Sequence, residues 1–288
     1  MHNLKFGLVV TLTGNKLLPS VAKSPAKDTN NLVLPYFQRL DYEALWFAGS
    51  FLKPTIGEPA DIQDVGSLVN KIVRQAKPNN IGLGILPPLG EDITSGVDKL
   101  LSRLHQQQVR NNPVAIALAS QVSPESALIG GMHDYGLLSV GATTPGGFGA
   151  LSSHWEIYAR KAKENGRKAQ REQWTLVAPM HLAKTREQAI KQVLAGIDQY
   201  GPQYAEMGLT PTLLSGKALI ETLIKNGTAV VGTPDDAITQ INRLLAHTGG
   251  FGGLLLPTNN WANSPDTMQS YDMFSQYVIP HFRAKDPP

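Results

Sequence analysis

Cysteine is absent from all 288 residues of the chain. This excludes disulfide bonds, zinc sites built on thiolates, iron–sulfur clusters and a cysteine nucleophile within it. If the protein catalyses an oxidation or a reduction, it therefore needs a bound cofactor.

Long apolar runs are also missing. No uninterrupted apolar stretch approaches the ~20 residues of a membrane-spanning helix. The first residues, 1–7, enter a short apolar run that lacks the long apolar region of a signal peptide. We therefore expect a cytoplasmic protein that does not associate with a membrane.

Neither sign of charge dominates, because 26 basic and 23 acidic residues give a formal net charge of only +3. The densest basic region lies in a predicted helical stretch with Glu164 and Glu172 mixed into it, and comprises Lys161, Lys163, Arg167, Lys168 and Arg171. Such mixing is typical of a solvated helix face and favours it over a nucleic-acid surface. We predict no nucleic-acid partner.

Several catalytic motifs are absent, namely H-E-x-x-H, the G-x-x-x-x-G-K-[ST] phosphate loop and the G-x-S-x-G elbow. Residues 146–149 read Gly-Gly-Phe-Gly but lack the third glycine of a dinucleotide fingerprint, so we interpret them as a loop. The seven histidines show no metal-ligand spacing, and no metal site is predicted.

Short apolar runs alternate with helical stretches along the chain, which indicates βα units around a parallel sheet. No linker or repeat marks a boundary, so residues 1–288 are expected to form a single domain. The seven predicted strands are Leu4–Val10, Glu43–Ala48, Ile81–Leu86, Val114–Ala119, Gly136–Val140, Thr175–Met180 and Gly252–Leu256.

Capping residues mark four helix starts. They are Ser123-Pro124-Glu125, the Thr185 to Gln188 capping box, Thr233-Pro234, and Ser264-Pro265. Gly249-Gly250 should end the third of these helices, and the last should end before Pro280. A further helix is expected around 97–107, and a surface loop over 15–31.

Two features at predicted strand ends carry possible chemistry. The strand Val114–Ala119 leads directly into Ser120 and Ser123, where hydroxyls and free helix amides could hold a phosphate group, although a plain serine cap is the commoner explanation of such residues. His181 ends another strand, where it could be catalytic or could simply bond to the following helix.

Several segments together resemble the luciferase-like monooxygenase superfamily, and particularly its limonene-monooxygenase-like branch. The downstream segments are Trp174–Ala189, Val231–Ala237, Gly249–Gly253, Trp261-Ala262, Ser270-Tyr271 and Tyr277–Phe282. The upstream ones are Leu4–Leu8, Leu40–Trp46, Ile81–Gly84, Val114–Ala119, Ser123-Pro124, Gly136–Gly141 and His154-Trp155. The resemblance therefore spans most of the chain.

This resemblance implies a TIM-type (β/α) barrel and an FMN-dependent monooxygenase acting on a small organic substrate with molecular oxygen. A separate reductase would supply the reduced flavin, and a homodimer is expected. Ser120, Ser123 and Ser139 are the implied cofactor contacts, while no catalytic residue can be assigned. A related deazaflavin in place of FMN stays open.

Two departures from the family pattern matter. Ser50 follows the second strand where the family has histidines, and no fourth strand is recognisable between Pro88 and Val114. We therefore expect an incomplete barrel of about seven strands, with unpaired strand edges that must be bridged, covered or paired in a dimer. These losses keep a non-catalytic flavin-binding or scaffold homologue as the alternative function.

Overall fold

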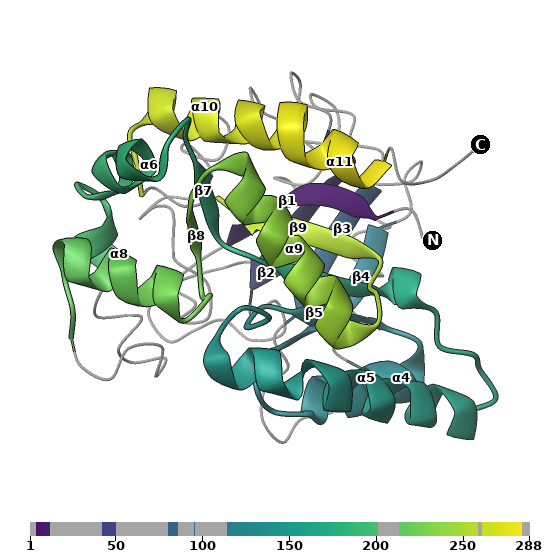
Figure 1. The fold of residues 1–288 in the computed structure, drawn as a ribbon. Coiled ribbons are helices and arrows are strands. Elements are labelled where there is room, and N and C mark those ends of the chain that lie inside the picture. The colour runs from purple at the N-terminus through teal and green to yellow at the C-terminus, as the bar shows by residue number, and fades with distance from the viewer. Residues whose placement is uncertain are drawn as a thin grey trace.

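Seven parallel strands form the centre of the molecule in a computed structural model, which describes residues 4–11, 42–49, 80–85, 95, 114–200, 213–258 and 261–283. The strands follow the order β1-β2-β3-β4-β5-β6-β9 around a closed barrel (Figure 1). They are β1 (Lys5–Thr11), β2 (Ala44–Gly49), β3 (Asn80–Ile85), β4 (Val114–Ser120), β5 (Gly136–Ser139), β6 (Trp174–Val177) and β9 (Gly253–Pro257). The predicted seven-stranded barrel is confirmed.

The barrel closes without the family's additional strand because β3 pairs directly with β4, with Ile81 opposite Val114 and Ile85 opposite Leu118. The last strand, β9, pairs with both β1 and β6 and completes the ring. The expectation that two unpaired edges would need a cover was therefore wrong at this position. The backbone N–H and C=O groups of β3 and β4 bond directly to each other, so neither strand has an unpaired edge here.

Alternate residues of the strands belong to two separate buried clusters, as the pleat requires. Val9, Trp46 and Leu138 belong to a cluster made of strand residues and Val140 just after β5, so they line the barrel interior. Leu118 and Leu137 share the larger cluster with helix residues and lie between strands and helices. The interior is narrow, and a side chain at Gly82 would collide with the Trp46 ring.

The predicted strand Thr175–Met180 is in fact two strands. Barrel pairing ends at Val177, and after Ala178 and Pro179 the chain leaves the ring as β7 (Met180–Leu182), which pairs with β8 (Val230–Gly232). Proline has no N–H to donate to a ladder, which accounts for the break. A second apolar cluster, which includes Val193, Leu219 and Leu223, covers this two-stranded sheet.

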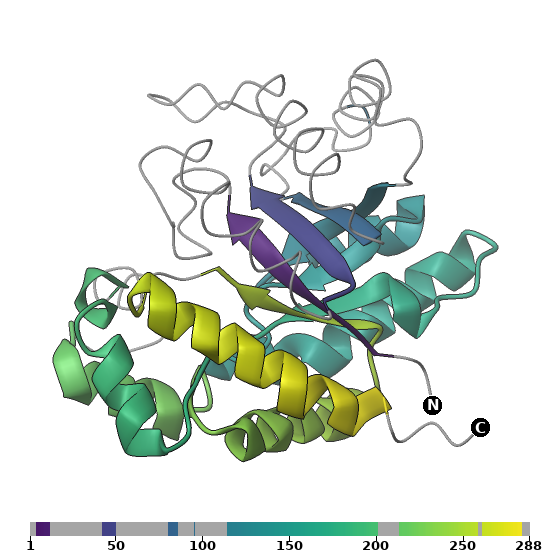
Figure 2. The same ribbon diagram turned by 90° about the horizontal axis from the view of Figure 1, so that it is seen from above.

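Helices surround the barrel on several sides. Figure 1 shows α4 and α5 together at one side and α10 with α11 at the opposite side, with α9 crossing the strands between them. Figure 2 shows α10 and α11 running alongside β1 and β9. The helices are α4 (Glu125–His133), α5 (Pro145–Glu164), α6 (Arg186–Val193), α8 (Gly216–Lys225), α9 (Pro234–Thr248), α10 (Ser264–Met273) and α11 (Ile279–Arg283). No helix in these described ranges has the length and apolar character needed to span a bilayer.

The predicted helix caps are confirmed at two starts and displaced at two. Thr185 accepts from the Gln188 amide, and Thr233 forms a reciprocal capping box with Asp236. Helix α4 begins one residue later than predicted, so Pro124 rather than Ser123 is the cap residue. In α10 the amide-accepting cap is Asn263, one residue before the predicted Ser264.

The last helix does not end before Pro280. A π-helical segment η3 (Phe274–Val278) joins α10 to α11, which contains the proline as its second residue. A wider turn accommodates a residue that cannot donate a backbone hydrogen bond. The prediction that the helix ends before Pro280 was therefore wrong, because the helix widens locally and continues.

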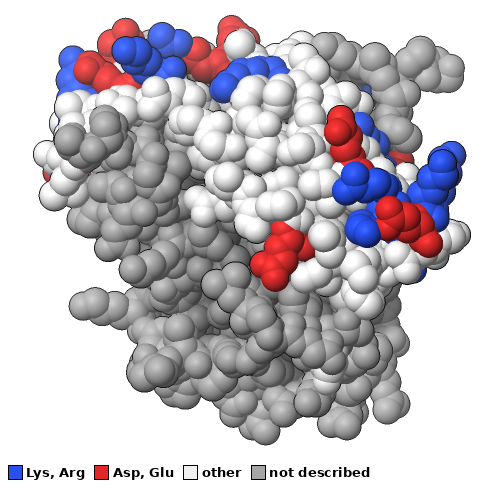
Figure 3. Space-filling model, turned by 90° about the horizontal axis from the view of Figure 1, so that it is seen from below, with Lys and Arg blue, Asp and Glu red and all other residues white. Residues whose placement is uncertain are grey.

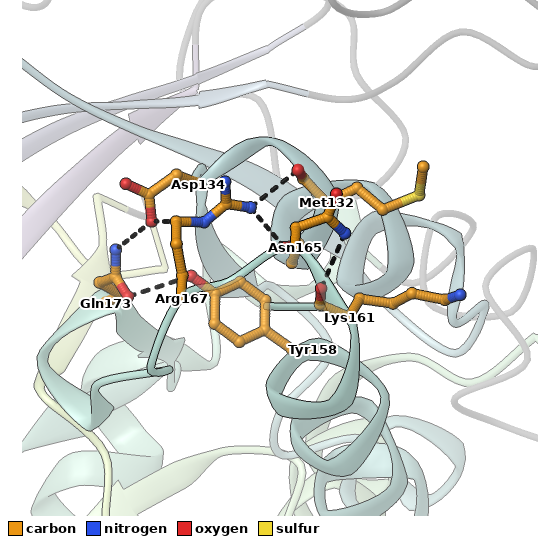
Figure 4. Close-up of polar contacts among 8 residues, drawn as sticks. Met132, Asp134, Tyr158, Lys161, Asn165, Arg167 and Gln173 are labelled. Atoms are coloured by element: carbon orange, nitrogen blue, oxygen red, sulfur yellow. Dashed lines mark hydrogen bonds and ion pairs between the residues drawn. The ribbon is translucent and has the colours of Figure 1, made fainter. Parts of the chain in front are cut away.

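Basic side chains that follow α5 stabilise the fold through hydrogen bonds. Helix α5 ends at Glu164, so Arg167 lies beyond it, and Arg171 begins a separate short 3₁₀ helix, η1 (Arg171–Gln173). The Arg167 guanidinium donates to the carbonyls of Gly131 and Met132 at 2.8 and 2.7 Å and thereby caps α4, as Figure 4 shows. A cation is favourable at a helix C-terminus.

The charged surface agrees with this use of the basic side chains. Lys161 pairs with Glu164 at 2.6 Å, and Arg167 lies 3.7 Å from Asp134. On the face drawn in Figure 3, basic and acidic side chains lie next to each other in mixed groups, and a small acidic group stands apart from them. No basic patch without acidic neighbours is visible on the described part of that face.

Candidate functional site

The carboxyl ends of β4 and β5 carry the predicted serines side by side. Ser120, the last residue of β4, pairs in register with Ser139, the last residue of β5. In a parallel barrel all carboxyl ends lie at one rim, which is where such folds place their active sites. The loop from Ser120 to Ser123, here called the β4–α4 loop, therefore lies at the carboxyl-terminal rim of the barrel.

Ser120 is almost completely buried and points toward the helices. It has the same strand parity as Leu118, which lies on the helix side of the barrel. Its Oγ is 2.9 Å from Nδ1 of His154 and 3.5 Å from the carbonyl oxygen of Ser123. The hydroxyl therefore has one partner on α5 and one in its own loop, and its single proton can go to only one acceptor at a time.

His154 holds the β4–α4 loop at two points. Its Nδ1 bonds to Ser120 Oγ and its Nε2 lies 2.9 Å from the carbonyl oxygen of Val122. A carbonyl only accepts, so Nε2 carries a proton and, in the neutral ring, Ser120 donates to Nδ1. Burial lowers the pKa of His154, while the bond to the Val122 carbonyl partly opposes this shift. The neutral ring is thereby favoured in this structure.

Ser123 is the exposed serine of the loop. Its Oγ accepts from the Glu125 amide at 3.4 Å, and no bond within the described residues uses its hydroxyl proton. It stands directly before α4, where backbone amides lack partners inside the helix. The Ser126 hydroxyl donates to the Ala119 carbonyl at 2.6 Å and fixes this first turn against β4.

Ser139 is buried, and its Oγ accepts a hydrogen bond from the indole Nε1 of Trp174 at 3.0 Å. Trp174 begins β6 and stacks on Trp155 of α5 with ring centroids 5.2 Å apart. The Ser139 side chain therefore lies in the layer between barrel and helices, like that of Ser120. Its hydroxyl proton is still available for donation, because the indole bond uses only a lone pair.

The turn after β5 packs closely on the β4–α4 loop. A side chain at Gly141 would come within 2.7 Å of Gln121 Cγ, so only glycine allows the two turns to approach this closely. Thr144 then caps α5 by accepting from the Gly147 amide at 3.1 Å. Residues 146–149, which we predicted to be a loop, are therefore the first turn of α5, announced by the same Thr-Pro pair as in α9.

The donors at this rim suit an anionic group without supplying a full charge. Ser123, Ser139 and the amides of the first turn of α4 are neutral donors of the kind that bind phosphate at helix N-termini. No ion pair or hydrogen bond in the described residues brings a lysine or arginine to residues 120–125. The carboxylate of Glu125 stands in the same turn. The residues present fit a phosphate group through hydrogen bonds and not through strong charge pairing.

The other predicted candidates separate clearly. His181 is buried, and its Nε2 bonds to Gln192 of α6 at 3.0 Å, which confirms the structural alternative for this residue. Burial lowers its pKa, while the Gln192 side chain and Asp266 oppose this shift.

Among the described residues no three histidine or acidic side chains gather closely enough to hold a metal ion. Ser50, the expected loop 15–31 and the helix expected around 97–107 lie outside the described residues.

A surface depression of about 740 Å³ lies elsewhere, between α9 and the α10–α11 segment. Its lining includes Asp235, Asp272, Tyr277 and His281, and none of its residues belongs to the β4–α4 loop. None of these residues belongs to β4 or β5, whereas Lys184 and Thr233 follow the carboxyl ends of β7 and β8.

Comparison with known proteins gives relatives in sequence and in fold. No family model matches the chain. Limonene 1,2-monooxygenase from Rhodococcus erythropolis is 35% identical over 199 residues, which are 67% of this chain and 50% of that enzyme. The 4-hydroxyprotoasukamycin monooxygenase of Streptomyces nodosus subsp. asukaensis is 30% identical over 187 residues, 63% of this chain and 50% of that enzyme. The chain thus spans about half the length of these relatives.

A solved structure shares the fold. It is the oxygenating constituent of 3,6-diketocamphane monooxygenase from Pseudomonas putida, a type II Baeyer–Villiger monooxygenase in complex with FMN. The TM-score is 0.66 at 14% identity, and the alignment covers 96% of this chain and 98% of that one. At this identity the likeness shows the shared barrel alone.

Proposed function

The chain belongs to the luciferase-like family of flavin-dependent monooxygenases, and from this premise we propose that it is an FMN-dependent monooxygenase that oxidises a small organic substrate with molecular oxygen. The observation that carries the proposal is the 35% identity to limonene 1,2-monooxygenase across two thirds of the chain. Members of this family bind a flavin, and the rim of the barrel offers donors suited to the phosphate of FMN. A related deazaflavin would use the same donors.

Within this proposal the serines have different parts. Ser123 would donate its free hydroxyl proton directly to a phosphate oxygen, and the amides of α4 would add further donors. Ser120 and Ser139 would support the phosphate from the buried side, where His154 and Trp174 orient them. Bound flavin would supply the reaction with oxygen, while the protein orients the substrate and excludes water. No described residue is assigned a catalytic role.

Partners and location are proposed on the resemblance alone. A separate reductase would supply reduced flavin, the protein would form a homodimer, and it would act in the cytoplasm. The direct pairing of β3 with β4 removes the unpaired edges that had favoured a dimer on structural grounds. The oligomeric state is therefore a question for measurement of mass in solution.

A turnover assay tests the activity. The purified protein is given chemically reduced FMN, oxygen and limonene, the substrate named for one relative, and oxygenated product is measured. Product formation above that of free reduced FMN supports the proposal. Flavin binding without product from any of a panel of small apolar substrates would favour the non-catalytic homologue.

That alternative is supported by a specific observation. The barrel has β4 beside β3 where the resemblance implies another strand, so a segment of the family's rim is absent between them. Ser50 also stands where the family pattern has histidines. A flavin-binding protein without turnover would keep the serine rim and lose the oxygen chemistry.

Replacing Ser123 by glutamate tests the phosphate contact. A carboxylate at this position would repel the phosphate, so FMN affinity should fall by about tenfold or more, which corresponds to roughly 1.4 kcal/mol. Thermal stability should be unchanged, because Ser123 is exposed. Ser215→Glu is the matched control, since Ser215 is also exposed and precedes a helix. Equal FMN affinity in both variants would remove Ser123 from the site.

A further inference from the structure

One imidazole holds the β4–α4 loop at two points. His154 reaches from α5 to Ser120 Oγ and to the Val122 carbonyl, each at 2.9 Å. We propose that His154 is the positioning residue of this loop and that it takes up a proton when a phosphate-bearing flavin binds there. The inference rests on the proposed function, because it assumes that an anion binds beside Ser120 and Ser123.

The direction of the Ser120–His154 bond depends on the proton count of the ring. With a neutral ring, the Val122 carbonyl requires the proton on Nε2, so the Ser120 hydroxyl must donate to Nδ1. In that state Ser120 has only lone pairs to offer, and it cannot donate to an anion. The bond therefore removes one donor from the rim.

Protonation reverses this bond. A charged ring donates from both nitrogens, to Ser120 Oγ and to the Val122 carbonyl, so neither existing contact is lost. The Ser120 hydroxyl can then donate its hydrogen bond to another acceptor in the loop. The Ser123 carbonyl at 3.5 Å is already placed as an acceptor, and a phosphate oxygen would be a stronger one. One proton thus adds both a donor and a positive charge beneath the loop.

The surroundings make His154 the basic group suited to this task. No hydrogen bond or ion pair joins a lysine or arginine to residues 120–125 in the described part of the chain. Burial, which lowers the pKa of His154, keeps the ring neutral until an anion arrives. A neighbouring phosphate opposes that effect, since an opposite charge favours the protonated form.

Other ionisable groups on the packed elements are engaged elsewhere. Helix α9 has Arg243 over the Phe148 ring, His247 bonded to the Phe148 carbonyl, and Asp236 paired with Arg186. On α5 itself, Arg160 and Lys161 pair with Glu164. Tyr158 of α5 donates its hydroxyl proton to the Gln173 side chain. The remaining ionisable side chains are Glu125 and His133 of α4, Asp235 of α9, and Glu156 and Lys163 of α5, and β4 has none. No charged side chain is among the causes that shift the pKa of His154.

The consequence is a linkage between proton and flavin. If His154 has a higher pKa in the complex than in the free protein, binding takes up protons at any pH between the two values. FMN affinity then falls as pH rises through the pKa of the complex, by up to about tenfold per pH unit. Riboflavin, which has no phosphate, should show no such dependence.

Calorimetric titration with FMN in two buffers of different ionisation enthalpy measures the proton uptake. The wild-type protein is compared with His154→Gln, which keeps a donor for the Val122 carbonyl, and with His154→Asn, which keeps an acceptor for Ser120. Neither replacement titrates. Because the FMN phosphate itself titrates near pH 6 in every sample, the difference between wild type and variant isolates His154.

We expect wild-type uptake to exceed that of both variants by up to about one proton per FMN. If uptake is equal while FMN still binds more tightly than riboflavin, the His154 proposal is overturned and the phosphate site stands. If FMN and riboflavin bind equally, or neither binds, the phosphate site itself fails. Should neither His154 variant fold, Ser120→Ala replaces them: loss of the hydroxyl should reduce the uptake, and unchanged uptake contradicts the proposal.

Discussion

His154 and His181 are both buried, and each bonds through Nε2 to an oxygen, of the Val122 carbonyl and of the Gln192 side chain respectively. Burial is the first cause of the lowered pKa of each. The two residues differ in the elements that they connect. His154 bonds through Nδ1 to a serine at the barrel rim, whereas His181 bonds to Gln192 of α6.

Acid should destabilise the protein through these two residues. Each has a folded pKa below the ordinary value of about 6.5, so the unfolded chain binds more protons between those values. The free energy of unfolding is therefore highest above about pH 6.5 and is lost as pH falls from there toward the folded pKa values. Urea denaturation at pH 7.5 and pH 5.5 measures this loss.

His181→Gln should reduce the loss on acidification, because glutamine does not titrate and can still donate to Gln192. His133→Gln, at an exposed position, is the control. An identical loss in wild type and His181→Gln would contradict the assignment of this effect to the buried ring.

For single residues, the sequence predicted which serines lie at a strand end but not their hydrogen-bond partners. Ser120 and Ser123 could be placed at a strand end because an apolar run leads directly into them. His154, however, lies 34 residues from Ser120, and no local spacing links them. The signal was present only in the resemblance, which includes His154-Trp155 without assigning it a role.

Helix α9 begins with a complete capping box at the position that the sequence predicts. Thr233 accepts from the Asp236 amide, and the Asp236 carboxylate accepts from the Thr233 amide at 2.8 Å. Thr233→Ala should lower the free energy of unfolding by about 0.5–2 kcal/mol, as other cap removals do. The exposed Thr239, in the same helix, gives the control: Thr239→Ala should stay within about 0.5 kcal/mol of wild type. Equal effects in urea denaturation would mean that the cap contributes nothing measurable.

Two of the wrong predictions, the single strand Thr175–Met180 and the helix end before Pro280, share a physical origin. Pro179 and Pro280 each break a regular pattern, and in each case the chain continued by a different geometry: a second sheet after the first proline and a π-helical turn before the second. Sequence patterns indicate that a proline disturbs an element. They do not indicate whether the element ends or changes its geometry, because distant packing decides that.

The whole molecule depends on a narrow barrel interior. With seven strands the ring has less space than with eight, and alanine and glycine positions make room for Trp46. The number of barrel strands was predictable because each is a separate apolar run, whereas β8 outside the barrel was not predicted. The closure of the ring was not, since direct pairing of β3 with β4 is a long-range contact with no local signature.

Gly82→Ala tests this crowding. A methyl group there would collide with the Trp46 ring inside the barrel, so the variant should lose about 1–3 kcal/mol of unfolding free energy. Gly149→Ala is the matched control, because its added carbon meets no neighbour within 4 Å and lies in a helix. That change should stabilise by about 0.5–1 kcal/mol. A neutral Gly82→Ala would show that the interior is looser than described.

The account as a whole depends on whether the protein binds a flavin at the serine rim. Titration of the purified chain with FMN, oxidised and then reduced, followed by flavin fluorescence and absorbance, measures this directly. We predict micromolar or tighter binding in at least one redox state. Absence of binding in both states would contradict the proposal and mean that the luciferase-like barrel has been kept here without its cofactor.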